Sequence, residues 1–296
     1  MVNHNWSVKA LSRNVHVITV LADWRRPGFE FDALLTSDWH YDHPKCNRTL
    51  LRKHLGQALE KKAPVFCNGD AFCVMQGKKD RRGSKGDVRP EHMVADYFDA
   101  VPRSAAEELA EFAPVLAGFG YGNHETAIIK HNETDVLRSF VSTINQEHGA
   151  KAFLGGYGGW LFFRFVNPKN PKEMMTKRMK YFHGSGGGGI MSKGTLTNVR
   201  QAAIYPDADI VHKGHIHELW EMTLMQESVT SQGRVYHKTQ KHICTSAYKE
   251  EYGDGAEGWH IERGAPPKPL GGYWLKFQVD KRARAQEMFI SATQTV

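Results

Sequence analysis

Short apolar segments alternate with segments of helical spacing along most of the chain. Apolar residues that run together or alternate with polar ones predict strands at 15–20, 31–36, 64–67, 115–121, 160–166, 179–182 and 209–211. Apolar residues three and four apart predict helices at 50–59, 105–112, 133–148 and 196–203. A polar loop is expected after residue 166, and the part from about 221 to 296 is rich in strand patterns, most clearly at 235–245 and 273–279. This order predicts an α/β (α+β) fold.

No internal repeat or low-complexity tract divides the 296 residues, so we expect a single domain over 1–296. Between about 77 and 92, lysines and arginines outnumber acidic residues, and several glycines accompany them. This composition predicts a basic loop inserted on the surface. A second polar, turn-rich stretch at 248–270 is interpreted as a surface crossing, with a flap near the site as the alternative.

The composition is that of a folded protein, with 41% apolar residues and a formal net charge of +7. No apolar run approaches the roughly 20 residues that a membrane helix needs. The first residues lack the basic-then-apolar order of a secretory signal, so a cytoplasmic location is expected. The four cysteines form no Cys-x-x-Cys pair and are interpreted as reduced and structural.

Metal-ligand residue types follow five of the predicted strands directly. They are Asp38 and His40, then Asp70, then Asn123 and His124, then His183, and last His215 and His217. Strand ends of a layered α/β fold converge on one edge, which is where such folds place their sites. Carboxylate, imidazole and amide oxygen are ligands that suit Mn²⁺, Fe or Zn²⁺. Each short motif alone is weak, but their order along the chain predicts a metal site.

These motifs resemble the signature of the calcineurin-like metallophosphoesterases. The signature reads here as Asp38-Trp39-His40, Gly69-Asp70, Gly122-Asn123-His124-Glu125, His183 and Gly214-His215-Ile216-His217, and the resemblance covers about residues 31–220. It implies a β-sandwich of two mixed sheets flanked by helices. It also implies two divalent metal ions, for which Mn²⁺ is our first expectation and Fe, Zn²⁺ or Ni²⁺ are alternatives.

The resemblance also implies a role for each residue. One metal would be held by Asp38, His40, Asp70 and His217, and the other by Asp70, Asn123, His183 and His215. Two cations about 3.5–4 Å apart need a shared anionic ligand, which would be Asp70. A hydroxide between the metals would attack the phosphorus, and His124 would be the catalytic residue that assists the leaving oxygen.

Two positions depart from the family pattern. Many members carry a second Asp three residues after the bridging one, where it orients the catalytic histidine, and this chain has Cys73 there. His124 therefore lacks that partner or takes another carboxylate, for which Asp42 and Glu125 are candidates. The arginine of protein phosphatases is absent after the Gly-Asp motif, which argues against a serine/threonine phosphatase.

Candidate substrate contacts lie around these motifs. Trp39 is a candidate for stacking on a nucleobase, but packing in the core is the favoured alternative. His43 lies near the first ligands. In the basic loop, Lys79, Arg81 and Arg82 are proposed to contact a phosphate backbone.

The sequence therefore predicts hydrolysis of phosphoesters, with phosphodiesters (a nuclease or nucleotide phosphodiesterase) favoured by the basic charge. A phosphomonoesterase acting on a small substrate is one alternative, and a non-catalytic nucleic-acid-binding protein is another. A metallo-β-lactamase-like enzyme is excluded, because that class needs His-x-His-x-Asp-His, and here His215-x-His217 continues with Glu218 and then Leu219 at the Asp position. The expected partner is a phosphoester, with nucleic acid as one form and no membrane; the sequence names no protein partner.

Overall fold

Two β-sheets form the centre of the molecule. The computed structural model describes residues 5–77, 80, 83–187, 189, 191–253, 259–262, 264–279 and 287–296. In this part of the chain, one sheet has the order β1 (Asn5–Ser12), β2 (Val15–Leu21), β7 (Gly158–Asn167), β8 (Asn170–Phe182), β9 (Ile210–Lys213), β11 (Val235–Cys244) and β10 (Trp220–Val229). The other has the order β13 (Met288–Gln294), β12 (Tyr273–Val279), β3 (Glu30–Thr36), β4 (Val65–Asn68), β5 (Leu116–Gly120) and β6 (Phe153–Leu154).

Both sheets are mixed. Strands β3, β4, β5 and β6 are parallel neighbours, while β12 pairs antiparallel with β3 and with β13. In the other sheet, β2 and β7, β8 and β9, and β9 and β11 pair parallel, and the remaining pairs are antiparallel. The parallel strands β3, β4 and β5 therefore end at one edge of their sheet, with the segments that follow them side by side.

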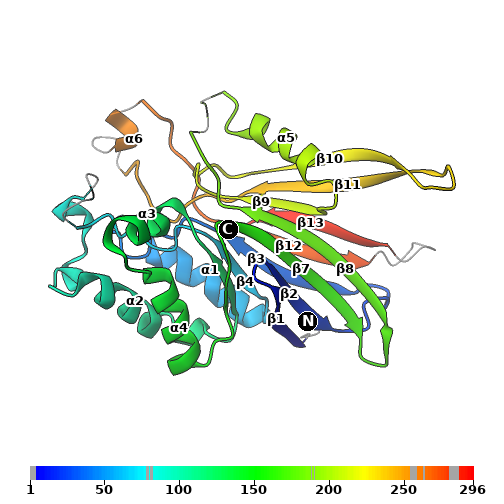
Figure 1. Ribbon diagram of the computed structural model, residues 1–296, viewed down its shortest axis with the longest axis horizontal. Coiled ribbons are helices and arrows are strands. Elements are labelled where there is room, and N and C mark those ends of the chain that lie inside the picture. Colours follow the sequence, from blue (N-terminus) through cyan, green and yellow to red (C-terminus); the bar gives the residue numbers. More distant parts are fainter. Residues whose placement is uncertain are drawn as a thin grey trace.

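The helices cover the outer face of the six-stranded sheet (Figure 1). They are α1 (Arg48–Lys61), α2 (Tyr97–Glu108), α3 (Asn123–Asn132) and α4 (Val136–His148). Helices α5 (Thr195–Ile204) and α6 (Trp259–Glu262) do not belong to this helical layer. Three short 3₁₀ turns also occur, at η1 (Lys85–Asp87), η2 (Pro90–His92) and η3 (Ala110–Phe112).

Two apolar cores hold these layers together. The first contains Phe31, Phe163, Phe165 and Phe277 and fills the space between the sheets, where the rings pack edge-on or tilted. The second lies between the six-stranded sheet and helices α1, α2 and α4, and Phe140 of α4 belongs to it. Strands β4 and β5, and β3 from Ala33 onward, are buried on both faces, which is why they form apolar runs in the sequence. The predicted sandwich of two mixed sheets flanked by helices is thus confirmed.

Three predicted elements differ in the structure. The helix expected at 133–148 begins later, as α4 at Val136, because Glu133 ends the preceding helix α3 with a left-handed backbone (φ 52°) and Asp135 caps α4 by accepting the N–H of Arg138. The polar loop expected after residue 166 is wrong, since β8 begins at Asn170 and pairs with β7. Helix α2 begins at Tyr97, well before the predicted 105. In the described residues, no helix is long and apolar enough to span a membrane.

Candidate metal centre

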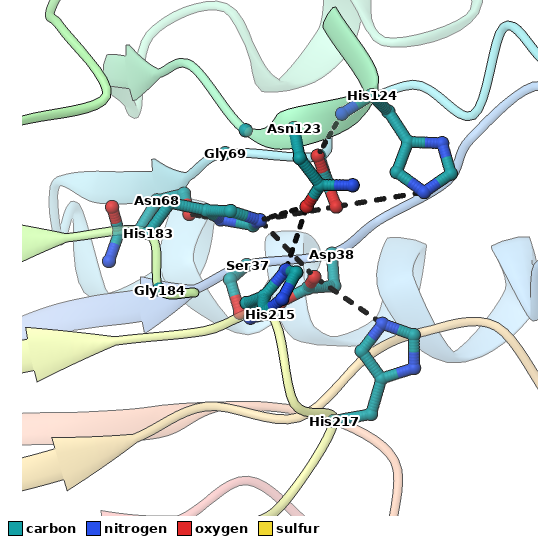
Figure 2. A network of polar contacts seen from close by, with 12 residues as sticks. Ser37, Asp38, Asn68, Gly69, Asn123, His124, His183, Gly184, His215 and His217 are labelled. Carbon is teal, nitrogen blue, oxygen red and sulfur yellow. Dashed lines mark hydrogen bonds and ion pairs between the residues drawn. The ribbon is translucent and has the colours of Figure 1, made fainter. Parts of the chain in front are cut away.

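The predicted ligand residues meet where strands of both sheets end. Asp38 and His40 follow β3, Asp70 follows β4, Asn123 opens α3 just after β5, His183 follows β8, and His215 and His217 follow β9. Figure 2 shows the side chains of Asp38, Asn123, His183, His215 and His217 turned toward one another. The structure therefore brings together residues that are up to 179 positions apart, from Asp38 to His217.

The backbone at this edge takes an uncommon conformation. Five of the ligand-type residues have positive φ angles, between 45° and 71°: Asp38, His40, Asp70, His215 and His217. A non-glycine residue rarely adopts this left-handed region, and such strain concentrates at functional sites. The strained turns are held by neighbours, since the N–H of Asp38 donates to the carbonyl of Gly69 (2.9 Å). The N–H of His40 likewise donates to the carbonyl of Asp70 (3.1 Å).

The side chains include two adjacent groups of ligand atoms that each contain a carboxylate, and Cys73 forms a third group with His40 and His124. In the first, atoms of Asp38, His40 and His217 all lie within 4.8 Å of one another, and Asp38 Oδ1 is 3.4 Å from His217 Nε2. In the second, the same holds for Asp70, His183 and His215, and Asp70 Oδ2 is 3.1 Å from His183 Nε2.

Asn123 belongs to the second group, because its Oδ1 lies 2.7 Å from His215 Nδ1 and 3.3 Å from His183 Nε2.

Several of these atoms are buried without a hydrogen-bond partner. Asp38 Oδ1 and both ring nitrogens of His40 have no hydrogen-bond partner, and both side chains are almost fully buried. An unsatisfied buried polar atom costs about 1–3 kcal/mol, so a cation that accepts these lone pairs would remove a substantial penalty. The donor set of carboxylate, amide and imidazole fits a divalent metal ion.

The charges at the centre favour a cation. Burial opposes protonation of His183, but the carboxylate of Asp70 outweighs burial and raises the pKa of His183 to about 10. Burial likewise opposes ionisation of Asp70, yet His183 and then His124 hold the pKa of that carboxyl well below its ordinary value. Burial, and then His124, lower the pKa of His40, which keeps the neutral imidazole that a metal requires. The buried carboxylates thus attract positive charge, as a proton or as a metal ion.

Neighbouring groups orient the candidate ligands. His183 Nδ1 lies 2.6 Å from the carbonyl oxygen of Asn68, so this nitrogen is the donor and Nε2 faces the centre. The N–H of His215 donates to Asp38 Oδ2 (3.0 Å), and the N–H of His124 donates to Asp70 Oδ1 (3.0 Å). These bonds leave the remaining carboxylate oxygens, Asp38 Oδ1 and Asp70 Oδ2, directed at the histidines.

His124 is oriented by a backbone carbonyl. Its Nδ1 lies 2.8 Å from the carbonyl oxygen of Cys73, and its Nε2 lies 3.9 Å from Asp70 Oδ2. The carboxylates suggested as its partners make other contacts. Glu125 accepts the N–H groups of Asp70 (3.1 Å), Phe72 (3.1 Å) and Gly122 (2.8 Å), and Asp42 accepts those of Cys73 and Val74. Neither was predicted from the sequence to support backbone in this way.

The residues predicted to contact the substrate do not line the metal centre where the structure describes them. Trp39 is 1% exposed, packs edge-on against Phe119 and donates its Nε1–H to Thr36 Oγ1, so stacking on a base is wrong and the core alternative holds. His43 is buried and lies 3.2 Å from Asp87 Oδ1, which ties the strand end to the 77–92 loop instead of facing a substrate. The three basic residues of the loop, Lys79, Arg81 and Arg82, lie outside the described residues.

The position of Lys249 beside the ligand residues was not predicted from the sequence. The N–H of Tyr248 donates to the carbonyl of Asp38 (3.0 Å), so the start of the 248–270 stretch passes beside the site instead of crossing a remote surface. Lys249 is paired with Glu251, and burial together with its ammonium lowers the pKa of His43 to about 4. It lines a pocket shared with His217, Tyr252 and Lys268. No motif surrounds this lysine, so the sequence carried no signal for it.

The chain has the sandwich of two mixed sheets flanked by helices that the resemblance to the calcineurin-like metallophosphoesterases implied, and carboxylate, amide and imidazole side chains meet at its strand ends. No family model and no curated protein matches the sequence.

Three solved structures show low similarity to the chain. Vacuolar protein sorting 29 from Cryptosporidium parvum is 13% identical, with a TM-score of 0.37 and coverage of 90% of this chain and 100% of that one. Vps29 from Entamoeba histolytica, complexed with Zn²⁺, is 9% identical, with a TM-score of 0.35 and coverage of 89% and 99%. A predicted phosphoesterase from Streptococcus pneumoniae is 10% identical, with a TM-score of 0.31 and coverage of 90% and 99%.

Proposed function

We propose that this protein is a divalent-metal-dependent phosphoesterase that hydrolyses phosphodiesters. One observation carries the proposal, namely that two groups of metal-ligand side chains lie next to each other, each with a buried carboxylate. Asp38, His40 and His217 would hold one ion, and Asn123, His183 and His215 the other, with Asp70 shared between them. The carboxylate and amide oxygens of this ligand set suit Mn²⁺, and its imidazoles also suit Zn²⁺, Fe or Ni²⁺.

The chain's own residues would prepare the reaction. When bound, two metal ions lower the pKa of water and neutralise charge on a phosphate. Asp70 and Asp38 hold the carboxylate charge that fixes the site, and their burial excludes water from their ligand oxygens. Because Nδ1 of His124 donates to a carbonyl, a protonated His124 presents Nε2–H toward the site, where it can donate to the leaving oxygen. His124 is therefore the proposed general acid.

The diester preference rests on charge. The net charge of +7 favours a polyanionic substrate such as nucleic acid. A phosphomonoesterase would use the same ligands, so the two activities are separated by assay.

The test compares 4-nitrophenyl phosphate with bis(4-nitrophenyl) phosphate, for the purified protein with Mn²⁺ and after chelation. We expect faster turnover of the bis-ester, and loss of turnover with chelator. Asp70→Asn should abolish activity while the circular dichroism spectrum stays unchanged, because a neutral amide cannot offset the repulsion between two cations. Normal turnover in Asp70→Asn would refute the site, and faster turnover of the monoester would refute the diester preference.

A further inference from the structure

The peptide group that joins Cys73 to Val74 has polar contacts at both of its ends. Its carbonyl oxygen lies 2.8 Å from His124 Nδ1, and its N–H, on Val74, donates to Asp42 Oδ2 at 2.9 Å. One planar peptide therefore connects the carboxylate of Asp42 with the ring of His124.

The backbone here is strained in a way that makes this connection possible. Val74 has a φ of 39°, which is a genuine outlier for a β-branched residue, and it is fully buried. Such conformations cost about 1–3 kcal/mol and persist only where the surroundings hold them. Asp42 is the group that holds this one, since its Oδ1 also accepts the N–H of Cys73 at 2.6 Å.

Asp42 is itself rigidly placed. It is 1% exposed, and the hydroxyl of Tyr97 donates to its Oδ2 at 2.9 Å. Burial, and then the Asp42 carboxylate, raise the pKa of Tyr97 far above its ordinary value, so the hydroxyl stays a donor. The carboxylate thus accepts three hydrogen bonds, and two of them come from the turn that faces His124.

We propose that Asp42 is the positioning residue for His124, and that it acts through the Cys73–Val74 peptide. A carboxylate that accepts the N–H of a peptide polarises the carbonyl at the other end, which strengthens the bond that this carbonyl accepts. The peptide therefore gives His124 a more negative acceptor than an isolated carbonyl. This chain has no carboxylate at position 73, and the relay from Asp42 provides the orienting charge in its place.

The proposal rests on the proposed function where it concerns catalysis, but the hydrogen bond itself can be observed without turnover. Protein with ¹⁵N-labelled histidine is examined by NMR, in the presence of Zn²⁺ because this ion is diamagnetic, and His124→Ala identifies the ring signals. In the wild type we expect the Nδ1–H tautomer, with a downfield and slowly exchanging proton.

Two variants should move this proton in opposite directions. Asp42→Asn keeps an oxygen that can accept one N–H but removes the charge, so the Nδ1–H signal should shift upfield and exchange faster. Tyr97→Phe removes the hydroxyl that donates to Asp42 Oδ2, so this oxygen accepts the Val74 N–H more strongly. The Nδ1–H signal of His124 should therefore shift further downfield. If Asp42→Asn does not fold, the direction of the Tyr97→Phe shift still decides. An unchanged signal in either folded variant overturns the proposal.

Turnover measurements test whether Asp42 affects catalysis by His124. Asp42→Asn should lower turnover on the order of tenfold for a dinucleotide, whose alkoxide leaving group needs a proton, and much less for bis(4-nitrophenyl) phosphate. The matched control is Asp135→Asn. Asp135 also accepts a backbone N–H, from Arg138, and a tyrosine hydroxyl, from Tyr121. This control variant should lower the turnover of neither ester. Equal losses on both esters would overturn the positioning role. A wild type that hydrolyses neither ester would refute the proposed function alone, and the NMR result would still judge the relay.

Discussion

A single methyl group at Gly122 should disable the metal centre. A Cβ built on this residue would lie 2.0 Å from Asp70 Oδ1 and 2.4 Å from the backbone nitrogen of Asp70. The backbone at Gly122 has a φ of −111°, so an alanine is conformationally permitted there and the effect is purely steric. Gly122→Ala therefore tests whether the carboxylate of Asp70 must sit where the structure places it.

The required displacement follows from these contacts. Real Cβ atoms do not approach other heavy atoms within 3.0 Å, so the carboxylate or the Gly122 backbone must move by about 1 Å. Overpacking of this kind typically costs about 1–3 kcal/mol of stability. A displacement of about 1 Å at a reacting centre costs on the order of a hundredfold in activity. We expect losses of these sizes, together with weaker Mn²⁺ binding.

The assay is titration calorimetry with Mn²⁺, combined with thermal unfolding of the metal-free protein. The matched control is Gly56→Ala in α1, where the new Cβ would meet nothing within 4 Å and should stabilise the helix by about 0.5–1 kcal/mol. If Gly122→Ala bound two Mn²⁺ with wild-type affinity, the assignment of Asp70 as the shared ligand would be wrong.

Three further outcomes are expected. His124→Ala should reduce turnover most for substrates with poor leaving groups, and an equal loss on nitrophenyl esters, measured at saturating substrate, would argue against a general acid. Glu125→Gln leaves one acceptor oxygen for three backbone N–H groups, so urea denaturation should show a free energy of unfolding lower by about 1–3 kcal/mol. An unchanged urea midpoint would contradict the role of Glu125 as acceptor for these groups. Because the pKa of His183 is about 10 in the metal-free protein, it is protonated at pH 7 and must lose that proton to bind a metal. Mn²⁺ affinity should therefore rise as the pH rises toward 10, with proton release seen as buffer-dependent calorimetric enthalpies; a pH-independent affinity would exclude this linkage.

The chain's local patterns predicted most of the strands and the layered fold. Strands β4 and β5, and β3 from Ala33 onward, are mostly apolar because both of their faces are covered, and such runs are visible in the sequence. The solvent-exposed part of β8 was taken for a loop, since its lysines and its proline lack an apolar period. Helix α3 was missed as well, because it begins at Asn123, inside the motif itself, and buries only Glu125 and Ile128.

The identity of the candidate ligands and their order were determined by the sequence itself, because metal chemistry selects residue types and strand ends leave them next to glycines and turns. Which partner each side chain meets was decided only by the tertiary structure. Trp39 lies between two ligand positions yet faces the core, and His124 contacts a backbone carbonyl 51 residues away, whereas the sequence left open whether it has a carboxylate partner. The physical reason is that a short motif fixes chemistry along the chain, whereas the direction of a side chain depends on φ angles and packing that distant segments impose.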